Sequence, residues 1–209
     1  MIVLGLTGSI ATGKSTAAET FRSFGLPVFD ADAAVHRLLG PGGAGIEAVG
    51  AAFPDCTGPE RAIDRQKLGR RVFGDPAALA RLEAILHPLV RAAQDRFLAR
   101  CRARGEEIAV LDIPLLYETG GERRVDAVAV VSAPAFLQSQ RVLRRPGMTP
   151  ARLAAIRARQ WPDREKRRRA DFVIPTGLGR RRAVQAIAAV IDALRGRGAA
   201  RRGTACARS

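Results

Sequence analysis

The chain has 209 residues and a formal net charge of +15, with 35 Lys and Arg against 20 Asp and Glu. This length suits one domain with a small inserted or lid subdomain, and it is enough to bury a sizeable core. The positive charge indicates either a polyanionic partner, such as a nucleotide or nucleic acid, or only a solvated, arginine-rich surface.

The composition also argues against membrane and disulfide-rich classes. No stretch reaches about 18 uninterrupted apolar residues, so we expect no membrane span. The three cysteines are odd in number and lack metal-ligand spacing: Cys56, Cys101 and Cys206. With no recognisable signal peptide, we expect reduced thiols and a cytoplasmic location.

Short apolar runs alternate with helical patterns along the chain. Strands are predicted over residues 2–7, 27–30, 106–112, 127–131 and 172–174. Helices are predicted over residues 15–24, 34–39 and 180–194, and much of 46–104 and 141–169 is helical in pattern. Because helices separate the strands, we expect right-handed crossovers and a mainly parallel sheet covered on both faces.

Residues 8–15, GSIATGKS, fit the phosphate-binding pattern GxxxxGK[ST] at every fixed position, between a predicted strand and a predicted helix. Small residues let backbone N–H groups surround a phosphate, and a helix N-terminus favours negative charge. We expect Lys14 to reach the β- and γ-phosphates and Ser15 to ligate Mg²⁺. The predicted ATP-binding residues of this loop are Gly8, Ser9, Ile10, Ala11, Thr12, Gly13, Lys14, Ser15 and Thr16.

Acidic residues follow two of the predicted strands. Asp30 and Asp32 lie where ligands bind in open α/β sheets. There a carboxylate can orient a hydroxyl, accept its proton, support Mg²⁺ or cap the next helix. We assign capping to Asp30, and chemistry and metal support to Asp32. Asp112, at the end of IAVLD, either supports Mg²⁺ through water or pairs with a neighbouring donor.

Six segments, in this order, resemble the dephospho-coenzyme A kinase family. They are GLTGSIATGKST (5–16), VFDADAAVHRLL (28–39), LEAILHPLVR (82–91), LDIPLLYE (111–118), SQRVLRR (139–145) and RADFVIPTG (169–177). The phosphate loop is shared with many kinases, whereas the other elements in this order are more specific. The resemblance covers residues 1 to about 180.

The resemblance implies a P-loop nucleoside-triphosphate hydrolase-like fold, a three-layer α/β/α domain with a five-stranded parallel sheet. The expected core spans residues 1–44, 106–138 and 170–195. A CoA-side helical insertion is expected over 45–105 and a lid over 139–169. Residues 196–209 are expected to be a disordered basic tail.

The resemblance also implies roles for single residues. Asp32 matches the catalytic aspartate, and with Lys14 and Arg145 it forms the expected catalytic set. The substrate side is matched by His87 and Arg91 with Pro88 between them, and by Leu115, Leu116 and Glu118. Arg141 and Arg145 match lid arginines over ATP, and their spacing of four residues predicts one shared helix face.

Two departures from the family pattern concern the nucleotide site. Ala11 stands where glycine is common, which requires a negative φ or some backbone strain. Ile174, Pro175 and Thr176 replace a segment that commonly holds an asparagine, which affects a contact near adenine.

We therefore expect a Mg²⁺-dependent kinase that transfers the ATP γ-phosphoryl to the ribose 3′-hydroxyl of dephospho-CoA. A monomer is favoured, and neither nucleic acid nor membrane is expected as a partner. The alternatives are another small-molecule P-loop kinase of nucleoside, nucleotide or shikimate type, a nucleotide-dependent nucleic-acid-binding protein, or a binding module without activity.

Overall fold

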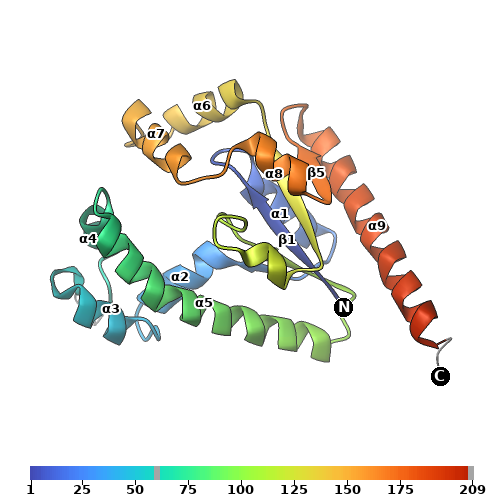
Figure 1. The fold of residues 1–209 in the computed structure, drawn as a ribbon, viewed down its shortest axis with the longest axis horizontal. Helices are drawn as coiled ribbons and strands as arrows, with labels where there is room; N and C mark the ends of the chain where they lie inside the picture. Colours follow the sequence, from blue (N-terminus) through green and yellow to red (C-terminus); the bar gives the residue numbers. More distant parts are fainter. Residues whose placement is uncertain (59–61, 207–209) are drawn as a thin grey trace. The chain divides into compact units, whose positions relative to one another are not determined.

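Strands and helices alternate along the chain in the computed structural model, which describes residues 1–58 and 62–206 (Figure 1). The strands are β1 (Ile2–Gly8), β2 (Val28–Asp30), β3 (Ile108–Asp112), β4 (Ala127–Ser132) and β5 (Phe172–Pro175). The α-helices are α1 (Lys14–Ser23), α2 (Ala31–Leu39), α3 (Ile46–Ala52), α4 (Arg65–Val72), α5 (Pro76–Ala103), α6 (Ala135–Leu143), α7 (Pro150–Ala158), α8 (Asp163–Arg169) and α9 (Arg180–Cys206). All five predicted strands are present, with bounds that differ by one or two residues.

The strands form one sheet in the order β2-β3-β1-β4-β5. β1 lies at its centre and pairs in parallel with β3 and β4, and β4 pairs in parallel with β5. The predicted α/β fold with a five-stranded parallel sheet is confirmed. Since the strands are parallel, their carboxyl ends share one edge, where Leu6 is opposite Asp112 and Gly8 is opposite Val131.

The alternation of side chains along the strands fills a core on each face of this sheet. On one face, Leu4 and Val131 belong to a buried cluster with Phe21 of α1 and Ile187 of α9. On the other face, a smaller cluster contains Leu116, Tyr117, Val128 and Val130, with Trp161 packed against it. The two layers fix β1, and with it the loop that follows.

The chain divides into two units, Met1–Phe29 with the chain from Cys101 onward, and Asp30–Arg100. The second unit has its own core, which includes Leu39, Val49, Phe53 and Leu86. The sequence predicted an insertion over 45–105, but the unit begins at Asp30. Leu39 of α2 explains the difference, because it lies in that core and its carbonyl accepts a hydrogen bond from the Ile63 N–H.

The segment predicted as a helical lid, residues 139–169, is largely helical. It includes the end of α6, all of α7 and α8, and a turn at Gly147, which has φ 71°. The tail differs from the sequence prediction. The expected disordered tail is helical as far as Cys206, because Ala and Arg are strong helix formers; residues 207–209 lie outside the described residues. None of the described helices is both long and apolar enough to cross a membrane.

Candidate active site

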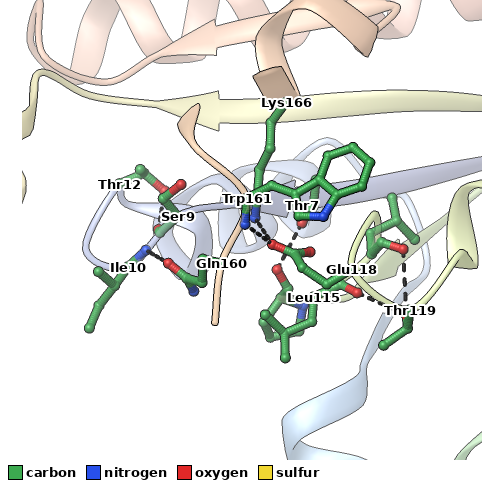
Figure 2. Close-up of polar contacts among 12 residues, drawn as sticks. Thr7, Ser9, Ile10, Thr12, Leu115, Glu118, Thr119, Gln160, Trp161 and Lys166 are labelled. Atoms are coloured by element: carbon green, nitrogen blue, oxygen red, sulfur yellow. Dashed lines mark hydrogen bonds and ion pairs between the residues drawn. The ribbon is translucent and has the colours of Figure 1, made fainter. Parts of the chain in front are cut away.

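The phosphate loop, residues 8–15, connects the central strand β1 to α1 (Figure 2). A Cβ on Gly8 would lie 2.6 Å from the Val131 carbonyl oxygen, so the start of the loop has no room for a side chain. Gly13, with φ 91°, is the N-cap of α1 and provides no side-chain cap. The N–H groups of the first turn of α1 therefore remain available to an anion.

Lys14 and Asp112 form an ion pair at the carboxyl edge of the sheet. The distance from Lys14 Nζ to Asp112 Oδ1 is 2.5 Å, and the two side chains are 16% and 4% exposed. The register explains this pair, because Asp112 ends β3 beside the end of β1. The structure thus shows Asp112 paired with a neighbouring donor, and its support of Mg²⁺ through water stays a prediction.

Ala11 adopts the left-handed conformation, with φ 57°, and it is the single non-glycine residue with positive φ in the described part of the chain. An L-residue with a Cβ adopts this conformation at a cost of about 1–2 kcal/mol. The Ala11 carbonyl accepts a hydrogen bond from Arg141 at 3.2 Å, and Thr176 donates to the neighbouring Thr12 carbonyl. The strain expected for alanine at this position is thus present, and contacts from distant segments accompany it.

Gln160 contacts the phosphate loop from the connection between α7 and α8. Its Oε1 accepts a hydrogen bond from the Ile10 N–H at 2.9 Å. By resemblance Gln160 matches a lid-end position of the family, but nothing in the local sequence around it indicates a contact with residue 10. The two residues are far apart in the sequence and meet only in the folded unit (Figure 2).

A cavity of about 370 Å³ opens beside the phosphate loop. Ala11 and Gly13 line it on the loop side, and α1 and α9 contribute Ala17 and Ile187. Cationic groups also line it, namely Arg141, Arg145 and Arg180. The apolar wall and the basic rim suit a purine base and its attached phosphates.

Arg141 and Arg145 do not share a helix face as predicted. Arg141 lies in the last turn of α6, whereas Arg145 lies beyond the C-cap residue Arg144. The chain leaves the helix there to enter the turn at Gly147, so the spacing of four residues no longer fixes a common direction. Both side chains nevertheless line the same cavity.

The acceptor-side residues of the 111–118 segment are mostly enclosed. Leu116 is fully buried, and Leu115 is half-buried and accepts a hydrogen bond from the Thr119 hydroxyl. Glu118 Oε1 lies 2.8 Å from Lys166 Nζ, and the Lys166 side chain is completely buried. Glu118 therefore forms an internal ion pair in this structure.

The remaining predicted site residues belong to the second unit. Asp30 caps α2, since its side chain accepts a hydrogen bond from the Ala33 N–H at 2.9 Å. This confirms the capping role and leaves Asp32 exposed in the first turn of the same helix. His87 and Arg91 are exposed on α5, on either side of the helix-internal Pro88 and Leu89.

Within residues 1–58 and 62–197, no three His, Cys, Asp or Glu side chains gather where they could hold a metal ion. Mg²⁺ does not require such a cage, because it is commonly bound by one or two protein oxygens together with substrate phosphates. The exposed Ser15 hydroxyl at the start of α1 fits that arrangement.

The chain resembles proteins of one family over most of its length. The family model for dephospho-CoA kinase matches residues 2–178. The dephospho-CoA kinase of Mesorhizobium japonicum is 62% identical over 196 residues, which cover 94% of this chain and 98% of that protein. The dephospho-CoA kinase of Rhodospirillum rubrum is 60% identical over 188 residues, 90% of this chain and 89% of that protein.

Solved structures agree with the sequence comparison. A crystal structure from Thermus thermophilus superposes with a TM-score of 0.79 at 35% identity, covering 92% of this chain and 96% of that one. The dephospho-CoA kinase from Campylobacter jejuni gives a TM-score of 0.65 at 26% identity with the same coverage.

Proposed function

This chain belongs to the dephospho-CoA kinase family, and on that premise we propose how its residues carry out the reaction. The enzyme transfers the γ-phosphoryl of ATP to the ribose 3′-hydroxyl of dephospho-CoA and so produces CoA and ADP. The observation that carries the proposal is the complete phosphate loop with its Lys14–Asp112 pair, within a chain that matches the family model over residues 2–178.

On the ATP side, we assign the phosphates to backbone N–H groups of the loop over residues 8–16, other than the Ile10 N–H, which donates to Gln160. We assign the base to the adjacent cavity. Lys14 would exchange part of its contact with Asp112 for the β- and γ-phosphates. Arg141 and Arg145, on the cavity rim, would stabilise the charge that spreads over the transferring phosphoryl group. Such transfer depends on alignment and charge neutralisation more than on covalent chemistry.

On the acceptor side, we assign the general base to Asp32. Its carboxylate is exposed at the start of α2 and takes no part in the cap, which Asp30 provides. Asp32 would orient the 3′-hydroxyl and accept its proton as the oxygen attacks phosphorus. His87 and Arg91 on α5, and the segment that holds Leu115, Leu116 and Glu118, are proposed to contact or shape the site for dephospho-CoA.

We propose Mg²⁺ as the cofactor, with Ser15 and Asp32 as its protein ligands. When bound, the ion neutralises charge on the β- and γ-phosphates. We also propose that the protein acts in the cytoplasm, a reducing compartment that suits its odd number of cysteines, and that it is a monomer.

A coupled assay of ATP consumption tests the assignment, with dephospho-CoA, shikimate and nucleosides compared as acceptors. We expect turnover with dephospho-CoA and a loss of at least about 100-fold in kcat for Asp32→Asn. Asp55→Asn, a change of the same type at an exposed carboxylate of the second unit, should retain activity. A folded protein that does not turn over dephospho-CoA would contradict the function, and an active Asp32→Asn would contradict the role of Asp32.

A further inference from the structure

We propose that Gln160 is a positioning residue for ATP binding, and that it holds the phosphate loop in its binding conformation through the Ile10 N–H. The kinetic part of this inference rests on the proposed function. Gln160 lies between α7 and α8 and has a neutral side-chain amide. Its oxygen accepts the Ile10 hydrogen bond without placing a negative charge beside the polyphosphate site.

The position of this hydrogen bond explains why it matters. The Ile10 N–H belongs to the Ser9–Ile10 peptide, one residue before Ala11, whose left-handed backbone is unfavourable for alanine. Fixing the Ile10 N–H and the Ala11 carbonyl restrains the peptide one residue before Ala11 and the peptide directly after it. Gln160 provides the first restraint and Arg141 the second.

A buried anchor fixes the position of Gln160. The N–H of the next residue, Trp161, donates to Glu118 Oε1 at 2.7 Å, and the same oxygen pairs with Lys166 at 2.8 Å (Figure 2). The Trp161 ring stacks on Tyr117, with centroids 5.7 Å apart and planes at 9°. The backbone at 160–161 is therefore held by an ion pair and by aromatic stacking.

The buried anchor and the hydrogen bond from Ile10 to Gln160 together explain how Gln160 acts on the phosphate loop. Glu118 and Lys166 fix the α7–α8 connection, and this connection places Gln160 beside the phosphate loop. Gln160 in turn fixes the Ser9–Ile10 peptide, one residue before Ala11. Without the Gln160 acceptor, Ala11 can relax toward negative φ, and the loop N–H groups no longer converge on a phosphate. The loss should reduce nucleotide affinity, because a smaller fraction of the protein has a binding-competent loop.

Gln160→Met tests the proposal, because it keeps side-chain length and removes the acceptor. We expect the Kd for ADP, measured by calorimetry without acceptor substrate, to rise about fivefold, and the KM for ATP to rise with it while kcat stays within about twofold. Gln160→Asn, which is one methylene too short to reach Ile10, should behave similarly. The matched control is Gln140→Met, the same change at an exposed glutamine of α6.

Ala11→Gly provides a rescue that a purely structural role of Gln160 would not produce. Glycine adopts positive φ at little cost, so in that background Gln160→Met should raise the ADP Kd less than about twofold. An unchanged ADP affinity in Gln160→Met, or an equal loss in both backgrounds, would overturn the proposal. Failure of the wild type to phosphorylate dephospho-CoA would overturn the kinase assignment instead, and the ADP measurements would still decide the role of Gln160.

Discussion

Tyr117 places a polar group in the core beneath the α7–α8 connection. Its side chain is buried, and its hydroxyl has no hydrogen-bond partner among the described residues. Burial, with a smaller contribution from Asp171 and Glu122, raises the pKa of Tyr117 to about 12. The ring contributes its stacking on Trp161, whereas the hydroxyl bears an uncompensated desolvation cost.

Tyr117→Phe should therefore leave the free energy of unfolding at pH 7 unchanged or raise it by up to about 1 kcal/mol. In the wild type, the folded-state pKa lies above the value of about 10 expected after unfolding. The neutral tyrosine thus contributes stability that is complete below about pH 10 and is lost as pH rises toward 12. Urea denaturation between pH 7 and 11 should show this loss in the wild type and not in the variant.

Tyr117 is the only tyrosine in the chain, so its ionisation can also be followed directly by ultraviolet absorbance. A titration midpoint near 10 in the folded protein would contradict the buried environment. An identical alkaline slope in wild type and Tyr117→Phe would show that other groups cause the loss of stability.

At the scale of elements, the Glu118–Lys166 pair joins α8 to the segment after β3. Lys166→Ala would leave the Glu118 carboxylate buried without its cation, which we expect to cost about 3–5 kcal/mol. The double variant Glu118→Gln with Lys166→Met should recover much of that loss, because it buries no charge. Chemical denaturation measures both effects.

Arg168→Ala is the matched control on the same helix. Arg168 is 69% exposed and lies 3.4 Å from Glu165, so its removal should cost less than about 1 kcal/mol. Equal losses for Lys166→Ala and Arg168→Ala would show that the buried pair contributes no more than a surface pair.

A structural element can be predicted from the sequence when the residues that determine it lie close together in the chain. The strands, the loop between β1 and α1 and the Asp30 cap follow from short patterns, and all three are present in the structure. The break after α6 and the start of the second unit at α2 depend on turns and packing that no short pattern records. Gln160 and Lys166 match lid-end positions of the family, but the sequence indicates no role for them, since their partners Ile10 and Glu118 lie far away in the sequence.

At the scale of the whole molecule, the two units have separate cores. The phosphate loop and the cavity beside it belong entirely to the first unit. We therefore expect ADP to slow amide hydrogen exchange in residues 8–16, 141–145 and 176–187. Exchange in the core of the second unit, around Val49 and Leu86, should change little.

Hydrogen exchange with mass spectrometry, with and without saturating ADP, tests this expectation. Binding that stabilises only the folded state is worth about 2.7 kcal/mol at 100 times Kd, enough for clear protection. Equal protection throughout both units would contradict local binding. It would indicate that ADP slows amide exchange only by making global unfolding less frequent.

The central position of β1 has a consequence for the order in which the protein can mature. β1 precedes the other described strands in the sequence, and its neighbours β3 and β4 begin only at Ile108 and Ala127. The intervening residues have a core of their own, whereas β1 must wait for partners distant in the sequence, a pairing that is slow to form. The phosphate loop is thus synthesised well before β3 and β4, and it becomes able to bind nucleotide only after they have paired with β1.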